Sequence, residues 1–199
     1  MRPTRLEAVG LWTTEACEDC PRVVLGSPFA GISKDELLDA TWAIQEIKAR
    51  FSSNPDFSNL PRKFKTALSG MLTNDVVHEL NDISFVGVEH PELDPGFDLW
   101  VGGGLSTNPR LAERLVVFVA EPEVPDVWAG VASLFRDYGY RRARHKARMK
   151  FLLADWGVQE FRRVREQEYL HHALPDGPAP APLAELGDHV GIHEQKGLL

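Results

Sequence analysis

Apolar side chains recur at helical spacing in three segments of the chain. The first predicted helix covers residues 33–51, where Ser33 and Glu36 form a capping box and the apolar positions fall on one side: Leu37, Leu38, Trp42, Ile44 and Ile47. The second covers residues 121–138, with an inward face made of Val127, Val131, Leu134 and Phe135. The third covers residues 157–171. Because each helix has one apolar face, each must pack against another layer.

Between the first two helices, three short runs alternate as strands do: residues 62–69, 82–88 and 97–102. Helices and strands together predict an α+β (mixed α/β) fold, in which a small mixed sheet is covered by helices. A Pro- and Ala-rich linker follows at residues 175–186. We therefore expect a first domain in residues 1–174 and the start of a second, truncated domain in residues 187–199.

The composition excludes several classes of protein. The chain has 199 residues, 43% of them hydrophobic, so it is long enough to form a globular core. Its 22 basic and 29 acidic residues give a net charge of −7, which argues against a general nucleic-acid binder. It has neither a run of roughly 18 apolar residues nor a secretory signal, so we expect a cytoplasmic protein that does not enter membranes. Its two cysteines, Cys17 and Cys20, are too few for a disulfide framework or a four-thiolate metal site.

Two lysines share one face of the first predicted strand. Alternation places Lys63 and Lys65 on one side of the strand and Phe64 on the other. Two adjacent ammonium groups repel each other in a cleft unless an anion lies between them. The same pattern is also typical of a half-exposed edge strand whose lysines discourage aggregation. The residues alone leave both interpretations open.

A glycine-rich turn follows the third predicted strand, at Gly102, Gly103 and Gly104. Glycines permit close approach of a ligand to the backbone, and the next residues favour a helix start: Ser106, Thr107, Asn108 and Pro109. Free N–H groups at a helix start bind anions. The stretch matches neither the dinucleotide-binding pattern nor the P-loop, so an ordinary tight turn is the alternative.

Basic residues are concentrated in residues 136–165, which hold ten Lys or Arg and three acids. A run of this kind is typical of a solvated helix face. In a chain of negative net charge it also suits a polyanionic ligand, of which nucleic acid is one example.

Five motifs, taken in this order, resemble the ferredoxin-dependent sulfite and nitrite reductases: TTEACEDCPRVVLGSP, LPRKFKTALSG, HELNDISFVGV, PGFDLWVGGGLSTNP and RDYGYRRARHKARMKFLLADWG. The resemblance spans about residues 10–177 and is strongest to the actinobacterial type of assimilatory sulfite reductase. It implies two related halves around a siroheme bridged to a four-iron four-sulfur cluster, with ferredoxin as electron donor and sulfite or nitrite as substrate. Residues 1–174 would be the siroheme domain of the first half, and residues 187–199 the start of a second ferredoxin-like half domain.

The resemblance also implies roles for single residues. The cations of the active cavity match Arg22, Lys63 and Lys65. The expected lining of the cofactor cavity is Asn81, Gly102, Gly103, Gly104, Thr107 and Asn108. The candidates for binding siroheme carboxylates are Arg142, Arg148 and Lys150. We expect Arg148 and Lys150 to point to the cavity of Lys63, and three further arginines to lie largely in solvent: Arg162, Arg163 and Arg165.

Finally, the resemblance implies what this chain lacks. The cluster ligands of the family are four cysteines in the second half, and Cys17 and Cys20 do not match them, so no metal ligand is expected here. The implied function is one part of an assimilatory sulfite reductase that is inactive until the missing second half completes it. The alternatives are a nitrite reductase fragment, a non-catalytic module that binds a tetrapyrrole or another polyanion, and, against the net charge, a nucleic-acid binder.

Overall fold

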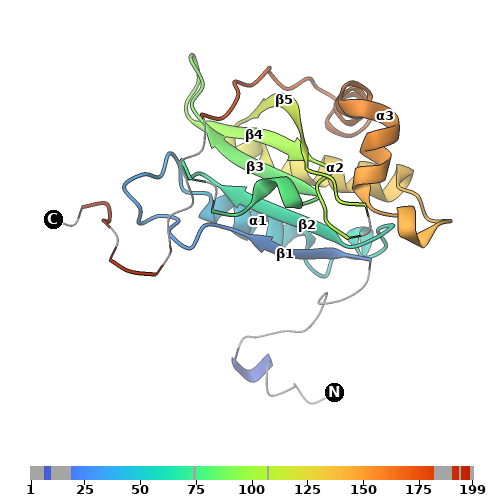
Figure 1. The fold of residues 1–199 in the computed structure, drawn as a ribbon, viewed down its shortest axis with the longest axis horizontal. Coiled ribbons are helices and arrows are strands. Elements are labelled where there is room, and N and C mark those ends of the chain that lie inside the picture. Colours follow the sequence, from blue (N-terminus) through green and yellow to red (C-terminus); the bar gives the residue numbers. More distant parts are fainter. Residues whose placement is uncertain are drawn as a thin grey trace.

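The computed structural model describes residues 7–9, 19–73, 75–106, 108–181, 190–192 and 194–197. Their centre is a five-stranded sheet in the order β1-β2-β3-β4-β5 (Figure 1). The first three strands run parallel and the last three antiparallel, so the sheet is mixed, as predicted. The strands are β1 Pro21–Leu25, β2 Phe64–Ser69, β3 Ile83–Val88, β4 Gly96–Val101 and β5 Glu113–Val119.

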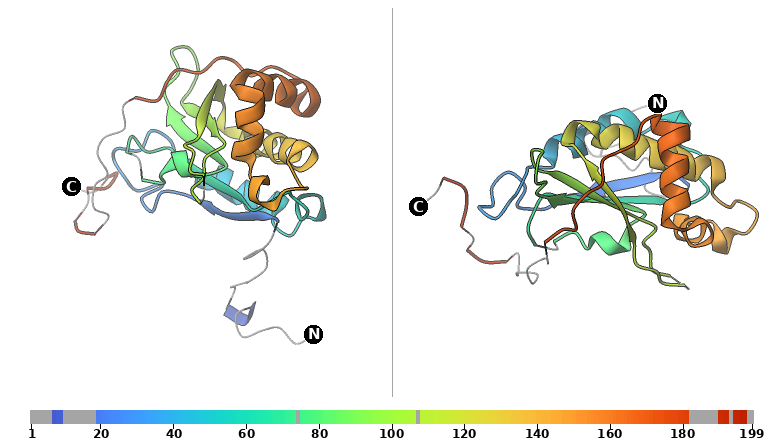
Figure 2. Two further views of the ribbon diagram at one scale, coloured as in Figure 1. Left: turned by 45° about the vertical axis from the view of Figure 1, so that its right-hand side comes forward. Right: turned by 90° about the horizontal axis from the view of Figure 1, so that it is seen from above.

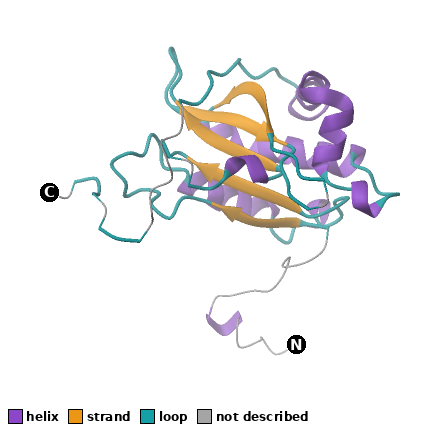
Figure 3. Ribbon diagram, in the orientation of Figure 1, coloured by secondary structure: helices purple, strands orange, loops and turns teal. Residues whose placement is uncertain are grey.

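Helices cover one face of the sheet and loops the other. The three helices are α1 Thr41–Phe51, α2 Val124–Tyr138 and α3 Met149–Val164, and α3 continues as a π-helical turn, Arg165–Leu170. The pair α1 and α2 lies against one face, and α3 contacts α2, β4 and β5 at one end (Figure 2). The opposite face carries loops and the short 3-10 turn η3 His78–Leu80 (Figure 3). No helix in the described ranges is long and apolar enough to cross a membrane.

The core lies between the sheet and α2. Trp128 is fully buried, stacks on Phe51 at 4.6 Å and donates from Nε1 to the hydroxyl of Thr66 in β2 at 2.9 Å. Phe64 meets the same indole edge-on at 5.5 Å. The inward face predicted for α2 is confirmed, because four side chains are at most 1% exposed: Val127, Val131, Leu134 and Phe135.

The predicted start of the first helix is wrong. Helix α1 begins at Thr41, and the residues before it pair with distant parts of the chain. The carboxylate of Glu36 accepts the N–H of Gly31 at 2.9 and 3.0 Å, and the N–H of Leu37 donates to the carbonyl of Gly70 at 2.8 Å. The local bonds to Gly31 and the tertiary bond to Gly70 take the place of the predicted capping box. Trp42, expected on the buried face, is 43% exposed.

The three predicted strands are confirmed to within two residues at their starts, whereas β1 and β5 were not predicted. In β5 the alternation is interrupted at Val116, whose φ of 55° is left-handed. The predicted helix 157–171 begins eight residues earlier, at Met149. Gly157 (φ 74°) interrupts this helix. The apolar spacing before and after it therefore does not form one continuous helical pattern.

The described part of the predicted linker, residues 175–181, is anchored on the sheet. The N–H of Phe118 donates to the carbonyl of Pro175 at 2.9 Å, and the N–H of Gly177 to that of Val116 at 3.3 Å. We call residues 175–178 the strap. Farther along, the N–H of Lys196 donates to the carbonyl of Ile32 at 2.8 Å.

Candidate functional site

Two lysines lie at the start of the second strand. Lys65 is in β2 and Lys63 directly before it, and both side chains are half-buried. Phe64, between them, is fully buried, as the alternation predicts. The Nζ of Lys65 donates a hydrogen bond to the carbonyl of Leu80 at 3.3 Å. Within the described part of the chain, Lys63 makes no hydrogen bond or ion pair.

Arg22 lies on the neighbouring strand and is half-buried. Strands β1 and β2 pair in parallel: Pro21 lies opposite Phe64 and, after a bulge, Val24 lies opposite Thr66. Arg22 and Lys65 lie between these two pairs, one on each strand. Three cations therefore occupy adjacent places at the start of two neighbouring strands. That they converge on one cavity remains a prediction.

Asp82 joins this region to the rest of the site. Its side chain is fully buried directly before β3. Arg148 donates to Asp82 from Nε at 3.1 Å and from Nη2 at 2.9 Å to each carboxylate oxygen. The backbone N–H of Lys65 donates to Oδ2 at 2.8 Å, and the backbone carbonyl of Asp82 accepts the N–H of Gly102 at 2.9 Å. One residue thus fixes β2, the start of α3 and the glycine turn relative to one another.

Burial and charge together shift the pKa values of this cluster. Burial raises the pKa of Asp82, and the guanidinium of Arg148 opposes the rise. Burial lowers the pKa of Lys65; Asp82 opposes this change, and the positive charges of Arg148 and Lys63 add to it. Because Asp82 is already paired with Arg148, the two lysines leave an excess of positive charge. Such a surface attracts anions.

The glycine turn packs closely on the segment before β3. The N–H of Gly103 donates to the carbonyl of Asn81 at 2.8 Å, and a Cβ on Gly103 would lie 2.2 Å from the carbonyl oxygen of Glu79. Only glycine allows this approach. Asn81 is 2% exposed; its Nδ2 donates to the carbonyl of Val77 at 3.2 Å, and its buried Oδ1 has no hydrogen-bond partner. The turn serves protein packing and leaves one unsatisfied acceptor beside the cluster.

Lys150 closes the glycine turn from the first turn of α3. It is 3% exposed, and its Nζ donates to the carbonyls of Gly104 at 3.2 Å, Leu105 at 2.8 Å and Asn108. Burial lowers the pKa of Lys150. An ammonium group has three N–H donors, and all three are used. Lys150 thus holds the turn together in this arrangement, and its expected role as a ligand of siroheme carboxylates stays a prediction.

Comparison with known proteins identifies the family of this site. Residues 17–174 match the family model for the nitrite and sulphite reductase 4Fe-4S domain. The chain belongs to this family.

Among individual relatives of this reductase domain, the sulfite reductase (ferredoxin) of Mycobacterium tuberculosis (strain ATCC 25618 / H37Rv) is 63% identical over 192 residues, which are 96% of this chain and 34% of that protein. The ferredoxin–nitrite reductase of Leptolyngbya laminosa is 34% identical, over 96% of this chain and 38% of that protein. The solved structure of the Mycobacterium tuberculosis NirA protein matches with a TM-score of 0.92 at 63% identity, over 96% of this chain and 35% of that one. This chain therefore spans about a third of the length of these relatives.

The remaining residues named in the sequence analysis have different surroundings or fall outside the described part of the chain. Arg142 is exposed in the loop between α2 and α3, and Thr107 and Cys17 fall outside the described residues. Of the arginines expected in solvent, the side chain of Arg163 is 50% exposed and that of Arg162 25%. For Arg165 the expectation is wrong: its side chain is fully buried beside Glu166, and burial lowers its pKa to about 10.

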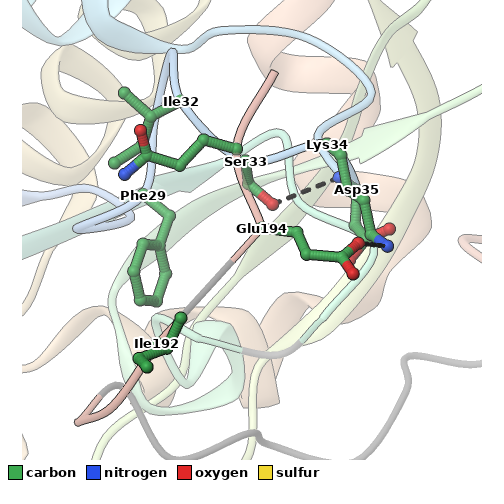
Figure 4. Close-up of a pocket in the computed structure, with 8 residues that line it drawn as sticks. Phe29, Ile32, Ser33, Lys34, Asp35, Ile192 and Glu194 are labelled. Carbon is green, nitrogen blue, oxygen red and sulfur yellow. Dashed lines mark hydrogen bonds and ion pairs between the residues drawn. The ribbon is translucent and has the colours of Figure 1, made fainter. Parts of the chain in front are cut away.

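The cations lie outside two hollows in the surface of the described residues. One hollow lies where Ile192, Glu194 and Gln195 meet the loop before α1, and Lys34 and Glu194 form an ion pair across it (Figure 4). The other lies between α2 and the π-helical turn, around Ser133 and Tyr169. Neither is lined by a residue expected in the site. We therefore base the site on the chemistry of the cations and not on the shape of these hollows.

Asp82 is the residue at the centre of this cluster that the sequence motifs do not indicate. The signal for it was present, because this acid directly precedes a strand of apolar and small residues, ISFVGV, and all six of them are buried. A charge in such a place requires a cationic partner. Its partner Arg148 is 66 positions away, and no spacing rule identifies it.

Proposed function

We propose that this chain supplies the siroheme domain of a ferredoxin-dependent assimilatory sulfite reductase and that residues outside this sequence complete the active centre. The observation that carries the proposal is the cation cluster: Arg22, Lys63 and Lys65 lie on adjacent strand positions, and the buried Asp82 is already paired with Arg148. The identity of 63% to a sulfite reductase, against 34% to a nitrite reductase, favours sulfite over nitrite as substrate.

The described residues fit a polycarboxylate cofactor such as siroheme. Lys63 and Lys65 are half-buried cations, and Lys63 has no competing partner in the described residues. Asn81 Oδ1 is a buried acceptor that a ligand or a water molecule would satisfy. We assign siroheme carboxylates first to the exposed Arg142 and to the free edge of Arg148, because Lys150 already donates three hydrogen bonds to the glycine turn. When bound, siroheme supplies the iron that binds the substrate and passes electrons to it.

The cations of this chain act on the substrate anion. Sulfite loses its oxygens as protons and electrons are added, so ammonium groups beside it stabilise negative charge and donate protons. The lowered pKa of Lys65 favours release of its proton. Arg22 orients the oxyanion through the planar donors of its guanidinium.

A four-iron four-sulfur cluster does not fit this chain. Such a cluster is held by four thiolates, and the sequence has two cysteines. Of these the structure describes Cys20, which is buried beside β1. The cluster ligands belong to the part of the enzyme outside this sequence, together with the second half that closes the site.

The same proposal covers the domain borders, the electron donor and the compartment. Residues 1–174 form the siroheme domain, residues 175–186 link it to the next, and residues 187–199 begin a ferredoxin-like half domain; the family match to residue 174 supports the first border. Ferredoxin donates electrons, as the names of the relatives state for those proteins. The protein works in the cytoplasm.

The test is a chimera in which this chain replaces the matching third of the 63% identical Mycobacterium tuberculosis enzyme. The purified chimera should show siroheme absorption, iron and labile sulfide, and should reduce sulfite with reduced ferredoxin. Faster reduction of nitrite than of sulfite would assign the nitrite alternative. A folded chimera that binds siroheme but reduces neither anion would contradict the catalytic proposal and leave a tetrapyrrole-binding module.

A further inference from the structure

Asp82 contacts three elements of the site, yet its carboxylate is shielded from any ligand. Its side chain is 0% exposed, and its oxygens accept bonds from Arg148 and from the N–H of Lys65. A carboxylate in this position acts on a substrate only through the groups it holds. Lys65 is the group in question, because its backbone is bonded to Asp82 and its ammonium lies against the carbonyl of Leu80, two residues before Asp82.

We propose that Asp82 is a positioning residue, which fixes the place and the charge of Lys65 through its bonds to Arg148 and to the backbone of β2. The inference rests on the proposed function, since Lys65 is there the residue that contacts the substrate anion. Two effects act through Asp82. Its bond to the backbone N–H of Lys65 fixes the point from which the side chain leaves the strand, and its negative charge offsets the surrounding cations.

The charges that face Lys65 come from every element around it. Asp82 before β3 is the negative one, and the positive ones are Arg148 before α3, Lys63 before β2 and, by register, Arg22 on β1. Asp82 favours the charged form of Lys65, and Arg148 and Lys63 disfavour it. Without the carboxylate of Asp82, the charges around Lys65 would all be positive, which disfavours its charged form. Without Arg148, the carboxylate would act on Lys65 with one opposing positive charge fewer, which favours the charged form.

The test measures the pKa of Lys65 in the full chain by carbon-detected NMR titration of labelled lysine side chains. The chain has seven lysines, so one Lys65→Arg spectrum assigns the signal. Asp82→Asn should lower the pKa of Lys65 by on the order of one pH unit, and Arg148→Gln should raise it. The two shifts have opposite signs. A merely structural role would loosen the strand in both variants and raise the pKa in both, towards its value in water.

Asp98→Asn is the matched control, because Asp98 is also fully buried and paired with an arginine, on β4 and away from Lys65. It should leave the pKa of Lys65 unchanged. An unchanged or raised pKa in Asp82→Asn would overturn the proposal. If Asp82→Asn does not fold, the double variant Asp82→Asn/Arg148→Gln, which buries neither charge, is compared with Arg148→Gln: a lower pKa of Lys65 in the double variant supports the proposal, and an equal or higher one overturns it.

A second readout is the pH profile of kcat/KM for sulfite in the chimera, whose basic limb should move to lower pH in Asp82→Asn and stay in place in Asp98→Asn. The NMR result needs neither siroheme nor substrate. A correct pKa shift with an inactive chimera would therefore reject the proposed function and keep the electrostatic role. An active chimera without the shift would reject the role of Asp82 alone.

Discussion

Two buried aspartate–arginine pairs lie in different parts of the molecule. Both carboxylates are 0% exposed, and both arginines donate two-pronged bonds: Arg148 to Asp82 at 2.9 Å, and Arg114 to Asp98 at 2.6 and 2.8 Å. Burial raises the pKa of both acids. As chemical units, the two pairs are nearly the same.

Their surroundings differ. Asp82 also accepts a hydrogen bond from the backbone of β2 and lies among the cations of the candidate site. In the other pair, Nη2 of Arg114 also donates to the carbonyl of Pro178 at 2.7 Å, which holds the strap on β5. The pair at Asp82 sets the charge around the candidate site, and the pair at Asp98 fixes the path of the strap along β5. The comparison shows that a buried ion pair is not by itself a sign of a functional site. The groups around the pair decide its role.

The largest expected difference concerns loss of the arginine. Arg148→Met leaves Asp82 buried without the guanidinium that pairs with it and should lower the free energy of unfolding by about 3–5 kcal/mol. Arg114→Met should cost less, about 1–3 kcal/mol, because Arg114 is 23% exposed against 12% for Arg148, and water reaches that pair more easily. Urea unfolding of both variants measures this. Equal losses, or a larger one at Arg114, would contradict the distinction.

A smaller difference should follow from adding one methyl group beside each pair. A Cβ on Gly103 would lie 2.2 Å from the carbonyl oxygen of Glu79 in η3, and one on Gly177 would lie 2.7 Å from the backbone of β5. Gly103→Ala should cost about 3 kcal/mol, and Gly177→Ala about 1 kcal/mol, because the strap lies on the edge strand β5 and shifts outward at the expense of a few hydrogen bonds. Thermal unfolding tests the order, and hydrogen exchange at Phe118 should rise only in Gly177→Ala.

The smallest effect is a dependence on pH that the two pairs share. A carboxyl whose pKa is raised in the folded state contributes stability that is fully present below the unfolded pKa of about 3.9 and lost as the pH rises through the folded pKa. The unfolding free energy of the wild type, relative to Asp82→Asn and to Asp98→Asn, should therefore increase as the pH falls from 7 to 4. If the unfolding free energy of the wild type relative to either variant decreased as the pH falls, the folded protein would favour the ionised form of that aspartate.

Much of the fold is predictable from the sequence, because alternation and helical spacing report burial directly. The strand of Lys63 and Lys65 and the inward face of α2 follow from local pattern alone. The start of α1 does not, because the bond from Leu37 to Gly70 spans distant parts of the chain. The same reason explains the site: Lys150 binds carbonyls 42 to 46 positions away, and no local rule distinguishes it from a lysine that faces a ligand.

The most direct test of the proposed site is the kinetics of Lys65→Met in the chimeric enzyme, beside Asp98→Asn. If Lys65 stabilises the substrate anion and donates protons to it, kcat/KM for sulfite should fall on the order of a hundredfold with an unchanged melting temperature and siroheme content. Asp98→Asn should show the reverse, a lower melting temperature with kcat/KM close to that of the parent chimera. Unchanged kinetics in Lys65→Met, with either sulfite or nitrite, would contradict the assignment of this cluster as the active site.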